Sequence, residues 1–212
     1  MSQKIQSLSE YFQEYQESIQ QPEEFWSRIA KNFHWKKTWD SVLSWNFEGP
    51  EVKWFENAQL NITENIFERQ LSTHGEKTAI LWEPNDPKEP ERSISYNELF
   101  QLTCQFSNAL ESQGIQKGDR VIIYMPMIPE AVIAMLACAR IGAIHSVVFG
   151  GFASNELASR IDDSKAKLLV TASCGFEPGR TVEYKPLVDE AIKQAKHKIS
   201  KMILFQRPGQ AI

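Results

Sequence analysis

Two adjacent glycines, Gly150 and Gly151, follow directly after the apolar run 144–149 and precede a polar segment with helical character. An apolar run of this kind indicates a buried strand of a parallel sheet, and open α/β sheets bind ligands at the carboxyl ends of their strands. Glycine at that edge permits backbone angles that other residues avoid, and it lets a ligand approach the main chain closely. The alternative is an ordinary strand-to-helix turn without a ligand.

A second candidate site follows the next predicted strand, in the segment 173-SCGFEPGRTVEYK-185. Pro178 and Gly179 indicate a turn that presents Arg180, whose planar guanidinium suits a phosphate. Glu177 would repel a phosphate unless it points away or pairs with a lysine. The alternative is a solvated Arg180 without a ligand, because surface arginines are common.

Other arrangements of catalytic residues are missing from the sequence. It has no GxxxxGK[ST] loop and no GxSxG, and FGGF does not fit GxGxxG. His34, His74, His145 and His197 are scattered, without HExxH or a cysteine cluster, so we expect no metal site. His145 and Ser146 are neighbours on a predicted strand and should point to opposite faces, which argues against a catalytic pair.

The composition indicates a folded protein of the cytoplasm. The 212 residues are 42% hydrophobic and 24% charged, which is enough to bury a sizeable core. A net charge of -4 argues against a nucleic-acid partner. Three distant cysteines without a CxxC pattern suggest reduced thiols. Because we find no apolar signal segment and no apolar stretch approaching eighteen residues, we expect neither secretion nor membrane insertion.

Residues 1–60 form a predicted helical N-terminal arm that packs on a larger body. The segment holds five of the six tryptophans and little β signal. Helical spacing predicts a helix over 7–20, with Ser9 as its cap, and a second over 22–33, with proline at its first position. The remainder, 34–61, has no clean period. We expect its tryptophans and phenylalanines to anchor the arm.

Residues 61–212 alternate between helical and strand patterns. The strand-like segments are apolar, and helices of ten to fifteen residues separate most of them, which predicts a mostly parallel sheet covered by helices on both faces. The fold class is therefore α/β, preceded by the Trp-rich arm. Because a parallel strand ordinarily feeds another crossover, we expect the sheet to continue past 212. The predicted helices are 61–75, 96–114, 128–142, 153–164 and 185–198, and the predicted strands are 77–84, 92–96, 117–126, 143–149, 166–173 and 201–205.

Two stretches resemble one enzyme family. The segment 54-WFENAQLNITENIFERQL-71 is similar to a WF…LN…N…R segment of acetyl-CoA synthetases. The block 118–173, which contains YMPMIPEAVIAMLACARIGA and HSVVFGGF, resembles the first half of the AMP-forming short-chain acyl-CoA synthetases, within the acyl-adenylate-forming superfamily. The resemblance runs from about Tyr11 to the end of the chain.

The resemblance implies a ligase that uses ATP, Mg²⁺ and coenzyme A. In the family, acetate and ATP give an enzyme-bound acetyl adenylate, and the coenzyme A thiol then displaces AMP. Gly150 and Gly151 correspond to the glycines that line the thiol channel. Arg180 corresponds to the second of two arginines, three residues apart, that grip the 3′-phosphate of coenzyme A. Glu177 stands where the first would be, so the loop reads EPGR, with Pro178 and Gly179 as weaker contacts.

The family's phosphate loop, acyl pocket, hinge aspartate and adenylation lysine would all lie downstream of this chain. The resemblance therefore implies that the chain holds no catalytic, ATP-binding or metal-binding residue, and that it is inactive alone. Two alternatives stay open. The complete enzyme could activate propionate or another short acid, or the chain could be a free-standing, non-catalytic module that binds coenzyme A or a separate catalytic chain.

Overall fold

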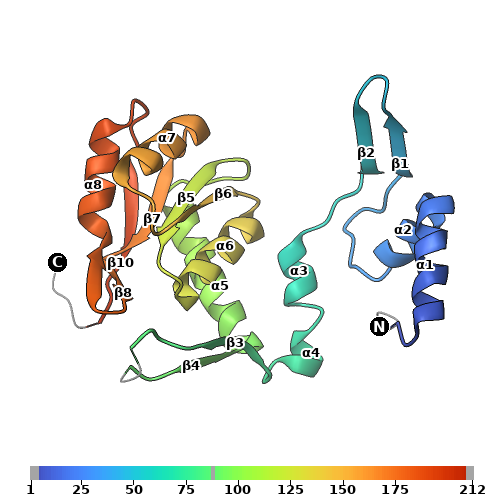
Figure 1. The fold of residues 1–212 in the computed structure, drawn as a ribbon, viewed down its shortest axis with the longest axis horizontal. Coiled ribbons are helices and arrows are strands. Elements are labelled where there is room, and N and C mark those ends of the chain that lie inside the picture. Colours follow the sequence, from blue (N-terminus) through green and yellow to red (C-terminus); the bar gives the residue numbers. More distant parts are fainter. Residues whose placement is uncertain (1–4, 87–88, 209–212) are drawn as a thin grey trace. The chain divides into compact units, whose positions relative to one another are not determined.

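A computed structural model of the chain describes residues 5–86 and 89–208. The chain divides into two compact units, one up to Arg69 and the other from Gln70 onward, and each is described by itself (Figure 1). Within the described ranges, no helix is long and apolar enough to cross a membrane. The domain boundary at residue 60 and the packing of the arm on the body remain predictions.

The first unit begins with two helices, α1 (Leu8–Gln20) and α2 (Pro22–Ala30), as the spacing of apolar residues predicts. The cap of α1 is Ser7 and not Ser9, which corrects the predicted boundary. The Ser7 side chain accepts a hydrogen bond from the Glu10 backbone N–H at 3.1 Å. Since this bond satisfies one of the free donors of the first turn, the helix begins one residue after Ser7.

An antiparallel hairpin follows, made of β1 (Ser41–Asn46) and β2 (Glu51–Glu56). The prediction that the arm is helical with little β structure is wrong for this segment. Large apolar side chains are paired across the two strands, as Leu43 is with Trp54, and such cross-strand pairs stabilise a hairpin. The short helix α3 (Ile62–Ile66) comes next.

Aromatic residues of the first unit contact one another. Ring centroids lie 5.2 Å apart between Trp35 and Trp39, and 5.4 and 5.1 Å from these two rings to Phe55. The Trp35 indole N–H donates a hydrogen bond to the Ala30 carbonyl at 2.8 Å. These contacts anchor the segment after α2 within its own unit.

The predicted helix over 61–75 is two short helices. The first, α3, ends at Ile66, and α4 (Leu71–His74) begins the second unit. Asn61 starts α3 by accepting a hydrogen bond from the Thr63 backbone N–H at 2.9 Å. Phe67, directly after α3, is fully buried. Tertiary burial of such a side chain overrides the helical spacing, which continues through the break.

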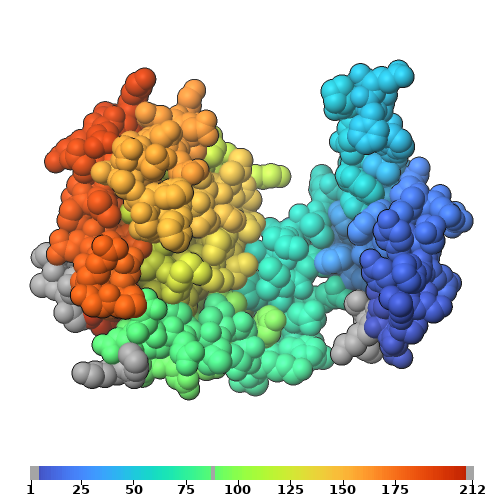
Figure 2. Space-filling view, viewed as in Figure 1, coloured from blue at the N-terminus to red at the C-terminus, as the bar shows by residue number. Residues whose placement is uncertain are grey.

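The second unit is built around a four-stranded parallel sheet with strand order β10-β7-β5-β6. Alternate residues of the central strands enter two separate cores, so both faces are apolar. Helices α5 and α6 supply one core and α7 and α8 the other, which confirms the predicted α/β class. In the space-filling view the orange and red segments that contain α7 and α8 form a continuous surface (Figure 2). The elements are β5 (Arg120–Met125), β6 (Ile144–Phe149), β7 (Leu168–Ala172), β10 (Lys201–Phe205), α5 (Tyr96–Ser112), α6 (Pro129–Ile141), α7 (Ser154–Ser164) and α8 (Tyr184–Gln194).

Two antiparallel pairs accompany the parallel sheet, one before its first strand in the sequence and one between β7 and β10. The predicted strands near 77–96 form the first pair, β3 (Thr78–Trp82) with β4 (Arg92–Ser95). The second pair, β8 (Cys174–Glu177) with β9 (Arg180–Glu183), occupies a segment that was predicted only as a turn after a strand. Gly179 in its turn has a φ of +76°, a conformation that glycine adopts without strain.

Candidate functional site

A pocket of about 480 Å³ lies at the carboxyl edge of the sheet, where the sequence placed the glycine pair. Gly150 and Gly151 follow the last residue of β6 and both line it. The wall is largely apolar, with acidic groups and one arginine. It is formed by Trp82, Glu83, Asn85, Glu89, Met125, Pro126, Met127, Ile128, Val147, Val148, Phe149, Gly150, Gly151, Gly175, Phe176, Glu177, Val182, Tyr184 and Arg207.

Lack of space, and not backbone conformation, favours glycine here: strictly at 150, and only weakly at 151. Neither residue is among the glycines with positive φ. A Cβ atom on Gly150 would lie 2.0 Å from the Tyr184 hydroxyl oxygen, which no real contact allows. On Gly151 it would lie 2.6 Å from a ring carbon of Phe149, which is exposed and free to turn. The expectation of unusual backbone angles is therefore wrong, and close approach remains as the reason.

Tyr184, the first residue of α8, forms the floor of the pocket. Its ring occupies space left by Gly150 and Gly175, since a Cβ on Gly175 would lie 2.9 Å from the ring. The side chain is 5% exposed, and burial, with smaller effects from Tyr124 and Glu177, raises the pKa of Tyr184 to about 12. The phenol therefore stays neutral at physiological pH.

Arg180 lies on β9, directly after the Pro178–Gly179 turn, as predicted. The sequence left two possibilities for Glu177, pointing away or pairing with a lysine, and in the structure it pairs with Arg180. The Arg180 guanidinium donates to one Glu177 carboxylate oxygen, with N···O distances of 2.7 Å from Nε and 2.6 Å from Nη2. Both side chains are exposed, so the pair is weak and open to exchange with a ligand.

A second hollow of about 590 Å³ brings the two predicted sites together. It contains Glu177, Pro178, Gly179 and Arg180, and it shares Asn85, Glu89, Phe176 and Glu177 with the first pocket. The glycine pair and Arg180 therefore border two adjoining hollows, which together are called the depression. The hollow at the glycine pair is largely apolar, and the hollow at the hairpin has a mixed wall that includes Arg180.

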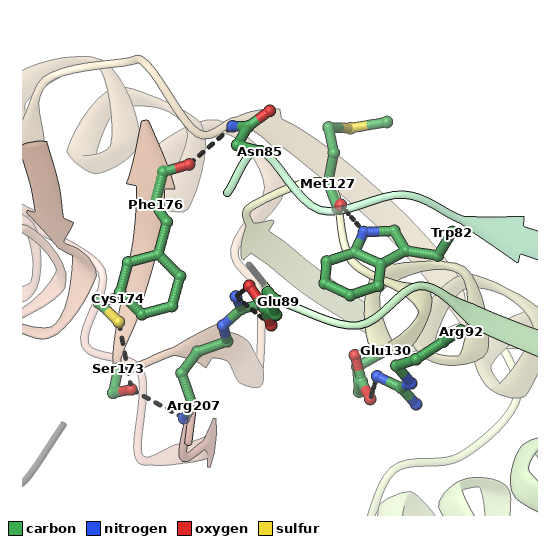
Figure 3. Close-up of polar contacts among 10 residues, drawn as sticks. All are labelled: Trp82, Asn85, Glu89, Arg92, Met127, Glu130, Ser173, Cys174, Phe176 and Arg207. Atoms are coloured by element: carbon green, nitrogen blue, oxygen red, sulfur yellow. Dashed lines mark hydrogen bonds and ion pairs between the residues drawn. The ribbon is translucent and has the colours of Figure 1, made fainter. Parts of the chain in front are cut away.

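Arg207 is a site residue that the sequence analysis missed. It follows β10, is 5% exposed, and its guanidinium lies over the rings of Phe176 at 4.8 Å and Trp82 at 5.7 Å. Figure 3 shows the same guanidinium facing Glu89, whose carboxylate oxygens lie 3.3 and 3.4 Å from it. A charged residue two positions after an apolar strand was the available signal. The buried cation joins the β3–β4 segment to the β8–β9 hairpin.

Two further hydrogen bonds fix the rim of the pocket (Figure 3). The Trp82 indole N–H donates to the Met127 carbonyl at 2.8 Å, and the Asn85 amide donates to the Phe176 carbonyl at 2.7 Å. These bonds link segments that lie 45 and 91 residues apart. The strands, the β3–β4 connection and the β8–β9 hairpin are thus tied around one depression.

None of the four histidines and three cysteines lines either hollow, although Cys174 directly precedes the lining residue Gly175 (Figure 3). His145, on β6, does not line either hollow, and burial lowers its pKa. Cys104, Cys138 and Cys174 form no disulfide. Within residues 5–86 and 89–208, no group of three or more His, Cys, Asp or Glu side chains could hold a metal ion.

Two protein families match the chain, one after the other. Residues 11–66 match "Acetyl-coenzyme A synthetase N-terminus", and residues 67–211 match "AMP-binding enzyme". The second match alone covers more than half of the chain. Together the two leave little of the sequence outside a family.

Curated proteins of known name are similar over nearly the same range. Acetyl-coenzyme A synthetase of Xylella fastidiosa (strain Temecula1 / ATCC 700964) is 45% identical over 93% of this chain and 31% of its own length. The protein of the same name from Yersinia pseudotuberculosis serotype O:1b (strain IP 31758) is 47% identical over 93% of this chain and 30% of its own length. The chain thus spans a little under a third of these relatives.

One solved structure with the same fold is acetoacetyl-CoA synthetase from Streptomyces lividans. It superposes with a TM-score of 0.84 over 93% of this chain and 30% of that protein, at 22% identity. This likeness concerns the fold alone. It supports the order and arrangement of the strands described above.

Proposed function

The chain belongs to the AMP-binding enzyme family, and we propose that it is the N-terminal part of an acetate–CoA ligase that forms AMP. The observation that carries the proposal is the succession of the two family matches along residues 11–211, with 45% to 51% identity to acetyl-CoA synthetases. We place the enzyme in the cytoplasm, without nucleic-acid or membrane partners.

The reaction has two steps. An acetate oxygen attacks the α-phosphorus of ATP, which gives acetyl adenylate and releases pyrophosphate. The sulfur of coenzyme A then attacks the carbonyl carbon of the adenylate, the thiol proton is lost, and the C–O bond to AMP breaks. We propose that the rest of the enzyme binds ATP and Mg²⁺ and supplies the chemical groups for the first step. This chain alone should catalyse neither step.

The role proposed for this chain is one wall of the coenzyme A channel. Gly150 and Gly151 would lie beside the uncharged chain of coenzyme A that carries the thiol, and Arg180 would contact the 3′-phosphate. The two adjoining hollows support this arrangement, because the apolar one suits an uncharged chain and the one at the hairpin offers a cation. Glu177, Pro178 and Gly179 are weaker contacts of the same ligand.

The first test is the intact mass of the protein in its native cells. A mass well above 24.3 kDa is expected, and the complete protein should then exchange labelled pyrophosphate into ATP when acetate is added. The same assay with propionate distinguishes an enzyme for the longer acid. A mass of 24.3 kDa would contradict the ligase and leave the non-catalytic module.

Gly151→Leu in the complete protein should block thioester formation and preserve acetate-dependent ATP–pyrophosphate exchange. The leucine would displace the Phe149 ring and fill the pocket beside the glycine pair. We expect acetyl-CoA formation to fall by a factor of about 100, which corresponds to about 2.7 kcal/mol. Gly151→Ala is the control, and its rate of acetyl-CoA formation should fall less. Loss of the exchange reaction in Gly151→Leu would place the residue in the adenylation step.

Arg180→Ala should weaken coenzyme A binding and leave dephospho-coenzyme A nearly unaffected. An exposed charge-assisted contact to a phosphate predicts a rise of about three- to tenfold in KM for coenzyme A. Glu177→Gln is the matched variant: it frees the guanidinium from its partner at 2.7 Å, so KM should fall. Equal changes for coenzyme A and its dephospho form would mean that Arg180 only supports the hairpin.

A further inference from the structure

The Tyr184 hydroxyl lines the depression and has no hydrogen-bond partner in the part of the chain that the structure describes. The residue is 5% exposed and lines the pocket. Among the described residues, none hydrogen-bonds this hydroxyl, and its oxygen is not one of the fully buried side-chain atoms that lack a partner, so it is open to the pocket. A buried phenol normally finds a partner, because an unsatisfied hydroxyl costs free energy. The oxygen is therefore available to a ligand or to water in the pocket.

The neighbouring Tyr124, unlike Tyr184, has hydrogen-bond partners for its hydroxyl within the protein. The two rings lie 5.0 Å apart. The Tyr124 hydroxyl donates to the Phe152 carbonyl at 2.7 Å and to the Gly150 carbonyl at 3.2 Å. Those nearby acceptors are thus already engaged by Tyr124. The Tyr184 oxygen instead lies where a Gly150 side chain would be.

The charges around the hydroxyl indicate what kind of group it would meet. Glu83, Glu89 and Glu177 line the same pocket, and its one arginine, Arg207, faces Glu89. A phosphate is therefore disfavoured here by carboxylates, whereas a neutral acceptor is not. A phenol that stays protonated donates its hydrogen, so the matching group is an uncharged carbonyl oxygen.

We infer that the Tyr184 hydroxyl donates a hydrogen bond to an amide carbonyl in the thiol-bearing chain of coenzyme A. The inference rests on the proposed function, since coenzyme A carries two amides between its phosphates and its thiol. Tyr184 is then a binding residue for the thiol-bearing chain of coenzyme A, while Arg180 binds its 3′-phosphate. The glycines at 150 and 175 leave the room that the ring needs to reach this position.

The test compares Tyr184→Phe with the wild type in the complete protein, with thiols that differ in amide content. Acyl transfer from preformed adenylate is measured with coenzyme A, pantetheine, N-acetylcysteamine and 1-butanethiol, the last of which has no amide. Loss of one neutral hydrogen bond predicts a fall in kcat/KM of about three- to tenfold for the amide thiols. No change is expected for 1-butanethiol.

A spectroscopic measurement checks the bond itself. With a ¹³C-labelled amide carbonyl in bound coenzyme A, the stretching frequency should be lower in the wild type than in Tyr184→Phe, because the hydrogen bond weakens the C=O bond. Tyr124→Phe is the matched control: it should lower stability and leave this frequency unchanged, since its hydroxyl bonds the protein's own carbonyls.

The outcomes separate the inference from the proposed function. Unchanged kcat/KM for coenzyme A in Tyr184→Phe, or an equal loss with 1-butanethiol, would overturn the role of the hydroxyl and leave the ligase intact. A wild-type protein that transfers its acyl group to no thiol would overturn both. Equal carbonyl frequencies in wild type and Tyr184→Phe would likewise exclude the bond.

Discussion

Gly150→Ala is expected to lower the free energy of unfolding by about 2–3 kcal/mol, the cost of overpacking a core. The added methyl carbon would lie 2.0 Å from the Tyr184 oxygen and 3.0 Å from its Cζ atom. The Tyr184 ring cannot easily retreat, because it is buried in a core with Tyr124 and the residues of α7 and α8. Hydrogen exchange of the β6 and α8 amides should show faster local opening.

The control for this prediction is Gly151→Ala, one residue further along. Its Cβ would approach only the Phe149 ring, which is 68% exposed and can turn away. We expect a cost below about 1 kcal/mol, as for most exposed substitutions. Equal losses at both glycines would mean that the clash with Tyr184 does not set the stability at 150.

A second variant tests the shared space directly. Tyr184→Leu removes the atoms that the new methyl group would meet, so Gly150→Ala should cost less in that background than in the wild type. Residues that share one space are coupled, and the double mutant should depart from additivity by about 1 kcal/mol or more. Strict additivity would contradict the steric explanation.

The parallel sheet could be predicted because its signal is local. Each strand of β5, β6, β7 and β10 is a short apolar run, and each helix between them has a continuous apolar stripe. Burial on both faces explains that pattern in the central strands β5 and β7. The edge strand β6 is also an apolar run, but Ile144, Val147 and Phe149 are exposed, so the expectation of a buried strand there is wrong. The predicted ends of the strands also gave the position of Gly150 and Gly151 at the carboxyl edge of the sheet.

The two hairpins could not be found by the same reasoning. The strands β8 and β9 have four residues each, too few to display an alternating pattern. In β1 and β2 the apolar residues fall on both faces, so the period is lost, although Gly49–Pro50 marks a turn between them. Cross-strand pairing stabilises these elements, and pairing is not visible in a window of sequence.

Only those residues of the candidate site whose role depends on a single sequence segment could be predicted. Arg180 stands out because its own turn presents it. Arg207 and Glu89 lie 118 residues apart, and Tyr184 gains its meaning from Gly150 and Gly175. From residue type alone, Arg207 and Glu89 would be taken for a surface ion pair, and Tyr184 for a core residue. Tertiary structure makes these residues part of the site, so sequence patterns could not identify them.

Arg207→Ala should lower the free energy of unfolding by about 3 kcal/mol, because three interactions of a buried cation are lost together. The guanidinium stacks on Phe176 and Trp82, and each desolvated cation–π contact contributes about 1 kcal/mol. Its aliphatic stem is also buried, and truncation removes that packing. Hydrogen exchange of the β8–β9 hairpin and of β10 in the complete protein measures the loss.

Glu89→Gln separates the ion pair from the stacking. It retains the shape of the partner and removes its charge, while the rings still hold the guanidinium. The contacts to Glu89 are long, at 3.3 and 3.4 Å, and its side chain is 29% exposed, so we expect a cost of only about 1 kcal/mol. Arg207→Lys should recover little, since an ammonium cannot stack as a planar group does. If Glu89→Gln costs as much as Arg207→Ala, the ion pair and not the aromatic stacking holds the hairpin against the sheet.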